Sequence, residues 1–274
     1  MSYIKLSDGT NIFYNRVGKG HAILCIHGFA ADHTAFRLTE KTLGRDYNII
    51  TLDLRGHGKS DETKSLSIEI LAKDLDEIIS KLGLKDFSIL GWSMGGSITL
   101  EYIKEFGTKN LGSLILVETS LKIINDTSWK HGLFKGEYKE ENLKSDLKKI
   151  DKSYSTWGTN FLKRMAPNLN KKDFEIAAKL IQDRNKKSMQ SLWKSLSEKD
   201  YSDISQKIDI PTLIIKGEKS EFYSLESAQI MAHIIKGTEL KIIANAGHLV
   251  PLENPVEFAR VVREFINNKN HNLL

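Results

Sequence analysis

The sequence contains very few of the residues on which covalent or metal-bound frameworks depend. Its one cysteine, Cys25, rules out an intramolecular disulfide and a zinc cluster built on several thiolates. The chain also lacks an apolar run of about 18 residues, the length that a membrane-spanning helix needs. The first twenty residues, MSYIKLSDGTNIFYNRVGKG, hold no hydrophobic segment of signal-peptide length. We therefore expect a soluble cytoplasmic protein with no membrane partner.

The charge is modest and evenly spread. The net charge of +5 comes from 40 basic and 35 acidic residues, with no long basic run interleaved with aromatic residues, so we expect no nucleic-acid partner. The sequence has no phosphate-binding loop and no histidine pair at metal-ligand spacing, so we expect neither a nucleotide nor a metal cofactor. Apolar residues make up 40% of the 274, enough for a sizeable core. Nothing in the sequence indicates the oligomeric state.

Short apolar runs of strand length recur along the chain, with helical patterns between several of them. Most are continuous enough to be strands buried on both faces of a sheet. At the N-terminus, two short segments flank the turn Ser7-Asp8-Gly9-Thr10, which predicts an antiparallel hairpin. The alternation predicts an α/β fold with a mostly parallel sheet and helices on both faces. After the hairpin, the predicted strands are Ala22–Ile26, Asn48–Leu52, Phe87–Leu90, Leu114–Val117, Thr212–Ile215 and Leu240–Ala244.

Two helices have clear start or stop signals. The first has its apolar stripe from Ile68 to Leu82 and ends at Gly83. The second is predicted to begin with Asn254 as N-cap and Pro255 at the first helical position. We expect the apolar face of this second helix to include Val256, Ala259, Val262 and Ile266.

The alternation stops between about residues 120 and 207. This stretch is Lys-rich and helical in pattern, with no strand signal, and is most simply a helical insertion that returns the chain to the same sheet. We therefore predict a core domain of residues 1–119 and 208–274 and an insertion of residues 120–207. Three of its tryptophans could line an apolar pocket, although aromatic residues at helical spacing more often pack the interior; they are Trp129, Trp157 and Trp193.

The segment GWSMGG places a serine between two glycines, at Gly91, Ser93 and Gly95, directly after a predicted strand and before a predicted helix. A sharp strand-to-helix turn of this kind needs small flanking residues and projects the serine from the sheet edge as a nucleophile. The same pattern alone also fits a glycine-rich turn with a capping serine. It does not fit a dinucleotide-binding loop, because serine stands at the third position.

A serine hydroxyl needs a base and a site for the developing oxyanion. Of the eight histidines, His248 alone follows a late strand in a glycine-containing loop just before a helix, so we predict it to be the base. The oxyanion would bind the backbone N–H of Met94 and a second N–H in the loop HGFAAD, which we assign to Phe29.

Five motifs occur in order: HGF at 27–29, LDLRGHGKS at 52–60, GWSMGG at 91–96, PTLIIKGEK at 211–219 and AGHLVPLENP at 246–255. With these motifs the chain resembles the α/β-hydrolase superfamily, and within it the small bacterial esterases and cofactor-free perhydrolases. The resemblance implies an eight-stranded sheet with an antiparallel second strand and a helical cap between strands six and seven. It also implies Ser93 as nucleophile, His248 as base, and Phe29 with Met94 as oxyanion hole.

The segment LDLRGHGKS contains Arg55 and His57, which look catalytic in isolation. In the superfamily this segment resembles a structural loop between the fourth strand and the next helix. We therefore leave both residues out of the predicted active site.

The resemblance also implies a triad acid after strand seven, where this chain has Ser220 in place of the usual aspartate. One explanation is that the acid has moved to Glu118, at the end of strand six, an arrangement that resembles the haloalkane dehalogenases of the same superfamily. A second is that Glu221 serves from the next position, which requires the loop to twist. A third is that no carboxylate serves. Of these we choose Glu118.

These observations predict a serine hydrolase of the carboxylesterase type that cleaves a small carboxylic ester, thioester or lactone through an acyl-enzyme. Its partner would be a small ester-like molecule. The alternative, motivated by Ser220, is a ligand-binding or signalling protein with weakened catalysis on the same scaffold. The sequence does not identify the substrate.

Overall fold

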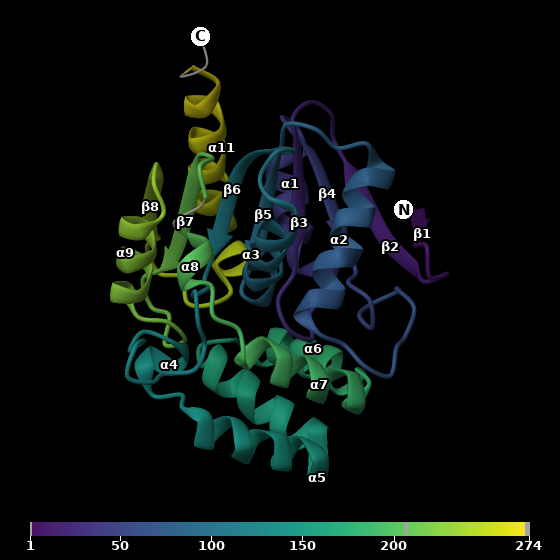
Figure 1. The fold of residues 1–274 in the computed structure, drawn as a ribbon, viewed down its shortest axis with the longest axis vertical. Helices are drawn as coiled ribbons and strands as arrows, with labels where there is room; N and C mark the ends of the chain where they lie inside the picture. The colour runs from purple at the N-terminus through teal and green to yellow at the C-terminus, as the bar shows by residue number, and fades with distance from the viewer. Residues whose placement is uncertain (1, 206–207, 272–274) are drawn as a thin grey trace.

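The computed structural model describes residues 2–205 and 208–271. An eight-stranded sheet forms its centre, with helices on both sides (Figure 1). The order of the strands across the sheet is β1-β2-β4-β3-β5-β6-β7-β8. The strands are β1 (Ser2–Lys5), β2 (Asn11–Val17), β3 (Ala22–Ile26), β4 (Asn48–Leu52), β5 (Phe87–Trp92), β6 (Leu111–Val117), β7 (Thr212–Gly217) and β8 (Thr238–Ile243).

Only the N-terminal part of the sheet is antiparallel. Strand β2 pairs antiparallel with β1, as the predicted hairpin requires, and also with β4. Every later pairing, from β3 with β4 to β7 with β8, is parallel. The predicted eight-stranded sheet with an antiparallel second strand is confirmed. Because β3, β5, β6, β7 and β8 run the same way, their carboxyl ends meet at one edge, which is where ligands bind in open α/β sheets.

Helices cover the two faces of the sheet. Helices α2 and α3 pack together on one face, and α1 and α11 pack together on the other (Figure 1). Helix α2 begins after Ser67, whose hydroxyl accepts the N–H of Ile70, and ends at Gly83 in a left-handed conformation (φ 62°). The helices and short turns of the core are η1 (His33–Phe36), α1 (Arg37–Leu43), α2 (Ile68–Leu82), α3 (Met94–Phe106), α9 (Leu225–Ile234), α10 (Val250–Glu253) and α11 (Pro255–His271).

Between β6 and β7 the chain leaves the sheet, and most helices of this stretch gather at one end of the molecule, whereas the short α8 lies beside α3 (Figure 1). We call residues 120–205 the cap. Helix α7 of the cap contacts α2 of the core, and α5 packs on both α6 and α7. The cap helices are α4 (Leu133–Gly136), α5 (Glu140–Met165), α6 (Lys171–Gln182), α7 (Lys186–Ser197) and α8 (Ser202–Ser205).

The bounds of three inner strands differ from the sequence prediction, because β5 and β7 end two residues later and β6 begins three residues earlier than predicted. Two further differences concern exposed apolar residues. Strand β8 begins and ends slightly earlier than predicted and, as an edge strand, leaves Ile242 49% exposed. In α11, Val256 is 75% exposed, because the buried face passes through Phe258, Ala259 and Val262 instead. Both errors come from treating an apolar residue as buried when its neighbours on the next element were unknown.

Within the described residues, no helix combines the length and hydropathy that crossing a lipid bilayer would require.

Candidate active site

Ser93 occupies the sharp turn between β5 and α3. Its backbone has φ 55° and ψ −120°, a strained conformation for a residue with a side chain. In this turn the first residues of α3 pass so close to neighbouring backbone that there is no room for side chains at Gly91 and Gly95. A Cβ atom on Gly91 would lie 2.6 Å from the carbonyl oxygen of Gly95, and one on Gly95 would lie 2.1 Å from that of Ile26. The two flanking glycines therefore serve the purpose that the sequence pattern predicts.

His248 lies in the loop after β8, fully within the protein. Its Nε2 atom is 3.0 Å from Ser93 Oγ, a hydrogen-bond distance. The indole N–H of Trp92 donates to the carbonyl oxygen of His248 at 2.9 Å, and the ring of Phe222 packs on the imidazole with centroids 4.3 Å apart. The first contact fixes the backbone of His248 and the second fixes one face of its ring, so that the imidazole stays close to Ser93.

Glu118 is the first residue after β6, and its side chain contacts the imidazole of His248. Its Oε2 atom is 3.1 Å from His248 Nδ1, and its side chain has no solvent exposure. Like Ser93 it has a left-handed backbone, with φ 47°. The structure therefore places Ser93, His248 and Glu118 in the order of a serine–histidine–acid chain.

Three further donors fill the remaining positions on the Glu118 carboxylate. Oε1 accepts the backbone N–H of Gly217 at 2.7 Å and the ammonium of Lys216 at 3.0 Å. Oε2, the oxygen facing the imidazole, also accepts the hydroxyl of Ser220 at 2.7 Å. With His248 this makes four contacts, about as many as an ionised carboxylate accepts. The serine at the usual acid position thus serves as a hydrogen-bond donor to the carboxylate that lies beside it.

Lys216 was not predicted as part of this site. Its side chain is 6% exposed and also donates to the Gly217 carbonyl oxygen at 2.8 Å. A buried ammonium needs a charged partner, and Glu118 is that partner. The sequence did carry a signal, because a lysine near the end of the buried run PTLIIKG calls for such a partner.

The electrostatics of Glu118 favour the ionised form. Burial on its own would raise the pKa of this carboxyl, but the hydrogen bond from His248, the charge of Lys216 and the hydroxyl of Ser220 outweigh it and lower the pKa below its usual value. A carboxylate that stays charged is what an imidazolium requires as a neighbour.

Glu221, the other predicted candidate acid, lies away from the histidine. Its side chain is 58% exposed and pairs with Lys135 of the cap at 2.8 Å. The two residues 220 and 221 point to different sides of the loop, as neighbours in extended chain do.

The two predicted oxyanion donors come from the start of α3 and from the turn after β3. Met94 is the first residue of α3, and the N–H groups in the first turn of a helix have no partner within that helix. Phe29 lies in the turn after β3, where Ala31 N donates to Gly28 O at 3.3 Å. Both residues line the same pocket as Ser93 and His248.

That pocket lies between the core and the cap, and its own side chains nearly fill it, leaving a cavity of only about 30 Å³. Among the described residues, none of the side chains that line it is Lys, Arg, Asp or Glu. Of the three predicted tryptophans, Trp193 lines it, whereas Trp129 and Trp157 are buried elsewhere in the cap. The apolar lining consists of Phe29, Trp92 and Met94 from the core, Ile123, Leu133, Phe161, Met165, Trp193 and Leu196 from the cap, and Phe222 with Tyr223 from the loop after β7.

Arg55 and His57 hold the loop after β4 together. Arg55 binds Asp74 through Nε at 2.8 Å and Nη2 at 2.7 Å. His57 is buried and its Nδ1 is 2.9 Å from the carbonyl oxygen of Arg55. Burial lowers the pKa of His57 well below its usual value, so this imidazole is neutral. Neither residue lines the pocket at Ser93.

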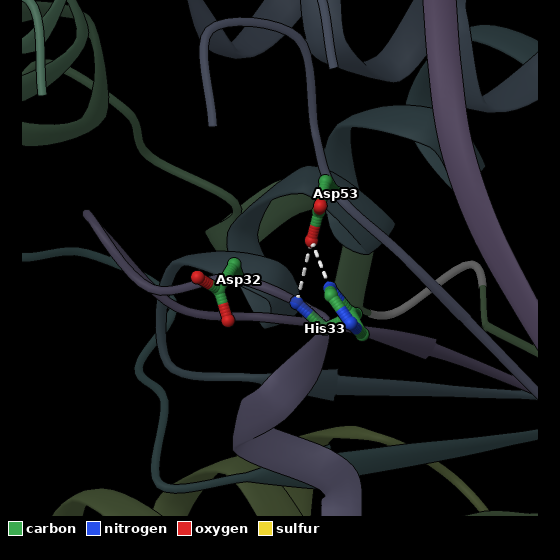
Figure 2. Close-up of side chains that lie close together, drawn as sticks. All are labelled: Asp32, His33 and Asp53. Atoms are coloured by element: carbon green, nitrogen blue, oxygen red, sulfur yellow. Dashed lines mark hydrogen bonds and ion pairs between the residues drawn. The ribbon is translucent and has the colours of Figure 1, made fainter. Parts of the chain in front are cut away.

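A second cluster of titratable side chains comprises Asp32, His33 and Asp53, whose ligand atoms all lie within 4.8 Å of one another (Figure 2). Asp53 Oδ1 contacts both the backbone N–H and the Nδ1 of His33, each at 2.7 Å. Asp32 Oδ2 faces the guanidinium of Arg184 at 3.2 Å. Internal donors, one of them cationic, therefore surround the carboxylates, so the cluster is better described as an ion-pair network than as a cation site.

The comparisons with known proteins agree with the fold. The model of the alpha/beta hydrolase fold family matches residues 21–255. An AB hydrolase superfamily protein of Bacillus subtilis, YisY, is 25% identical, with 97% of this chain and 99% of that protein aligned. The 3-oxoadipate enol-lactonase 1 of Acinetobacter baylyi is 24% identical over 90% of this chain and 89% of its own length.

Among solved structures, an esterase from Exiguobacterium antarcticum superimposes with a TM-score of 0.89 at 24% identity, covering 97% of this chain and 99% of that one. This likeness confirms the fold. Together with the match over residues 21–255, it shows that the chain belongs to the α/β-hydrolase fold family.

Proposed function

We propose that this protein hydrolyses small, uncharged carboxylic esters, thioesters or lactones through an acyl-enzyme on Ser93. The observation that carries the proposal is the distance of 3.1 Å from His248 Nδ1 to Glu118 Oε2. At this distance Glu118 provides His248 with the carboxylate that position 220 lacks. The family match and the named esterase and lactonase relatives support the same class of reaction.

In the first half of the reaction, His248 Nε2 takes the proton of Ser93 Oγ while the oxygen attacks the carbonyl carbon of the substrate. The negative charge that develops on the carbonyl oxygen is stabilised by the N–H groups of Phe29 and Met94. When the tetrahedral intermediate collapses, the bond to the leaving group breaks, and His248 returns the proton to it. The product of this half is the alcohol or thiol and an acyl group on Ser93.

In the second half, a water molecule gives a proton to His248 Nε2 and attacks the acyl carbon. The same N–H groups stabilise the second oxyanion. Its collapse breaks the bond to Ser93 Oγ, which takes the proton back from His248. The carboxylic acid leaves and the free enzyme is restored.

Glu118 acts in both halves by orienting the imidazole and stabilising the imidazolium. Its hydrogen bond to Nδ1 leaves Nε2 as the nitrogen that faces Ser93. Lys216, Gly217 N–H and Ser220 hold the carboxylate in place. We propose that these three contacts are what allow the acid to serve from β6.

The lining of the pocket supports an uncharged acyl group. Burying a charged group without a partner is strongly unfavourable, and the described lining offers aromatic and aliphatic side chains in place of a cation.

The test combines labelling with a matched pair of substrates. A fluorophosphonate should label Ser93 of the folded protein, and Ser93→Ala should abolish both labelling and turnover of p-nitrophenyl butyrate. The mono-p-nitrophenyl ester of succinate, which carries a carboxylate on a chain of the same length, should be turned over far more slowly. Absence of labelling together with absence of ester turnover would refute the proposal, and equal turnover of the two esters would refute its restriction to uncharged acyl groups.

The alternative of a ligand-binding or signalling protein was motivated by Ser220. That motivation weakens once Glu118 lies within hydrogen-bond distance of His248. It predicts saturable binding of an ester-like ligand without product, so rapid turnover of p-nitrophenyl butyrate would exclude it.

A further inference from the structure

The turn after β3, which carries the Phe29 N–H, is held in a strained conformation. Ala30, the third residue of the turn, has φ 57° and is 1% exposed. Left-handed backbone is unfavourable for a residue with a Cβ atom, and it persists only where the surroundings hold it. The question is which contacts hold this turn.

Arg184, from the link between α6 and α7 of the cap, reaches the turn directly. Its Nε donates to the carbonyl oxygen of Ala30 at 3.2 Å, and its Nη2 donates to that of Ala31 at 3.0 Å. Nη2 also pairs with Asp32 Oδ2 at 3.2 Å, and the side chains of this ion pair are 7% and 8% exposed. One guanidinium from the cap therefore binds three consecutive residues of the turn.

Asp32 anchors this contact to the core. It is the N-cap of η1, where its Oδ1 accepts the backbone N–H of Thr34 at 3.0 Å and the Thr34 hydroxyl at 2.5 Å. The carboxylate thus has one oxygen for η1 and one for Arg184. A planar fork of donors suits this arrangement of acceptors, whereas a lysine ammonium, as a point charge, cannot reach all three in the same way.

The side chain of Phe29 is held by the cap as well. Its ring centroid is 5.3 Å from that of Trp193, and it makes edge contacts with Trp157 at 6.1 Å and Phe161 at 6.4 Å. Both the backbone and the side chain of the turn therefore depend on where the cap helices lie.

We propose that Arg184 is a positioning residue that couples the docking of the cap to the alignment of the oxyanion donor at Phe29. When α6 and α7 lie against the core, the guanidinium donates hydrogen bonds to the carbonyl groups of Ala30 and Ala31 and holds the turn in its strained conformation. When the segment between α6 and α7 moves away, these hydrogen bonds break and the turn relaxes. The N–H of Phe29 then no longer points toward the oxyanion. This role rests on the proposed function, because it assigns the Phe29 N–H to the oxyanion.

The expected effect lies in turnover rather than in substrate binding. The oxyanion exists only in the transition state and the intermediates beside it, so misaligning its donor lowers kcat and leaves KM nearly unchanged. Loss of an oxyanion donor typically lowers kcat by about 10²- to 10³-fold, so its misalignment should lower kcat by about 10- to 100-fold.

The experiment compares Arg184→Met with Arg164→Met. Arg164 is a matched control from the same cap, because its guanidinium pairs with Glu137 of the cap and its side chain is 52% exposed. With p-nitrophenyl butyrate, Arg184→Met should show the loss in kcat and Arg164→Met should not. Arg184→Lys keeps the charge but not the fork, and provides the same comparison if the methionine variant does not fold.

A rescue distinguishes positioning from general destabilisation. Glycine adopts a left-handed backbone without steric penalty, so Ala30→Gly should remove part of the need for Arg184. The double variant Arg184→Met with Ala30→Gly should recover at least several-fold in kcat relative to Arg184→Met alone. Independent, additive effects of the two substitutions would contradict the proposal.

Hydrogen exchange supplies a readout that does not require turnover. Amides in a peptide covering residues 27–36 should exchange faster in Arg184→Met than in Arg164→Met. If the parent enzyme turns over and Arg184→Met matches Arg164→Met in kcat and in exchange, the role of Arg184 is refuted and the proposed hydrolysis stands. If the parent neither turns over nor is labelled at Ser93, the proposed function fails, and unchanged exchange would then refute the coupling of cap and turn as well.

Discussion

Two carboxylate–imidazole pairs follow strands of the same sheet, Glu118 with His248 and Asp53 with His33. In both, a carboxylate with no side-chain exposure is bound to the Nδ1 atom of the histidine, at 3.1 Å and 2.7 Å. In the first, the other ring nitrogen faces Ser93 Oγ in an apolar pocket. In the second, the same carboxylate oxygen also binds the backbone N–H of His33, and the imidazole packs on Phe13 with centroids 4.8 Å apart.

The difference shows that the pair by itself is a positioning device. A buried carboxylate orients an imidazole wherever the two meet, and at Asp53 the result is a fixed loop. Catalysis becomes possible only where the second nitrogen faces a nucleophile and the space beyond it admits a substrate.

The largest difference is expected when each pair loses its charge. Glu118→Gln should lower kcat for p-nitrophenyl butyrate by about 10³- to 10⁴-fold, because an amide cannot stabilise the imidazolium. Asp53→Asn should lower the melting temperature but leave kcat of the folded protein within about tenfold. Glu221→Gln, at an exposed ion pair, is the matched control and should change kcat little. A Glu118→Gln variant as active as its parent would remove Glu118 from the triad.

A smaller effect is expected from restoring an aspartate after β7. In Ser220→Asp the new carboxylate would lie against Glu118 Oε2, which Ser220 Oγ contacts at 2.7 Å. Two carboxylates so close repel, so one of them takes up a proton. We expect kcat to fall by about tenfold or more. Adding Glu118→Ser to this variant should recover part of the loss, because it removes the repulsion.

A large gain in kcat for Ser220→Asp alone would contradict this expectation. It would show that His248 lacks an effective acid in the parent protein.

The smallest effect concerns stability and pH at the second pair. The hydrogen bond that the imidazole of His33 donates to Asp53 raises the pKa of His33. Burial alone would raise the pKa of Asp53, but the N–H groups of His33 and Lys59 outweigh it and lower that pKa. A raised histidine pKa stabilises the fold at pH values below the unfolded pKa, and this contribution is lost as the pH rises through the folded pKa. A lowered aspartate pKa stabilises the fold at pH values above the pKa of the unfolded state. This contribution is lost as the pH falls through the lower pKa of the folded state.

Both contributions are therefore present near pH 5, between the two usual pKa values of about 3.9 and 6.5. The parent should melt at a higher temperature than His33→Gln at both pH values. The difference between their melting temperatures should be about 2 °C smaller at pH 9 than at pH 5. Thermal unfolding monitored by circular dichroism measures this. A gap that widens toward pH 9 would mean that the pair does not stabilise the fold through the histidine charge.

Much of the fold could be predicted from the sequence because its central strands are buried on both faces. Residues of β5, β6 and β7 are all buried, so their runs are continuous and bounded by turn residues. Strand β8 has a neighbour on one side only, which weakens the pattern and moved its predicted bounds. Local signals thus suffice to locate a strand that is buried along its whole length, but not to fix its ends, since β6 begins three residues before its predicted start.

The candidate site was predictable to the extent that its residues lie in local motifs. Ser93 and His248 have such motifs, and Glu118 could only be chosen among alternatives because its contact with His248 spans 130 residues. Lys216 and Arg184 were missed. Arg184 lies in a polar link of the cap, and nothing local indicates a contact with a turn 152 to 154 residues earlier.

Three residues at the site edge of the sheet, Ala30, Ser93 and Glu118, adopt left-handed backbone although none is glycine. Each such conformation costs about 1 to 3 kcal/mol, which the remaining structure must offset. This edge is therefore where thermal stability and activity oppose each other. Substitutions that let this edge adopt another backbone conformation will make the protein harder to unfold and slower to react, whereas stabilising changes on the outer faces of the helices leave the reaction unaffected.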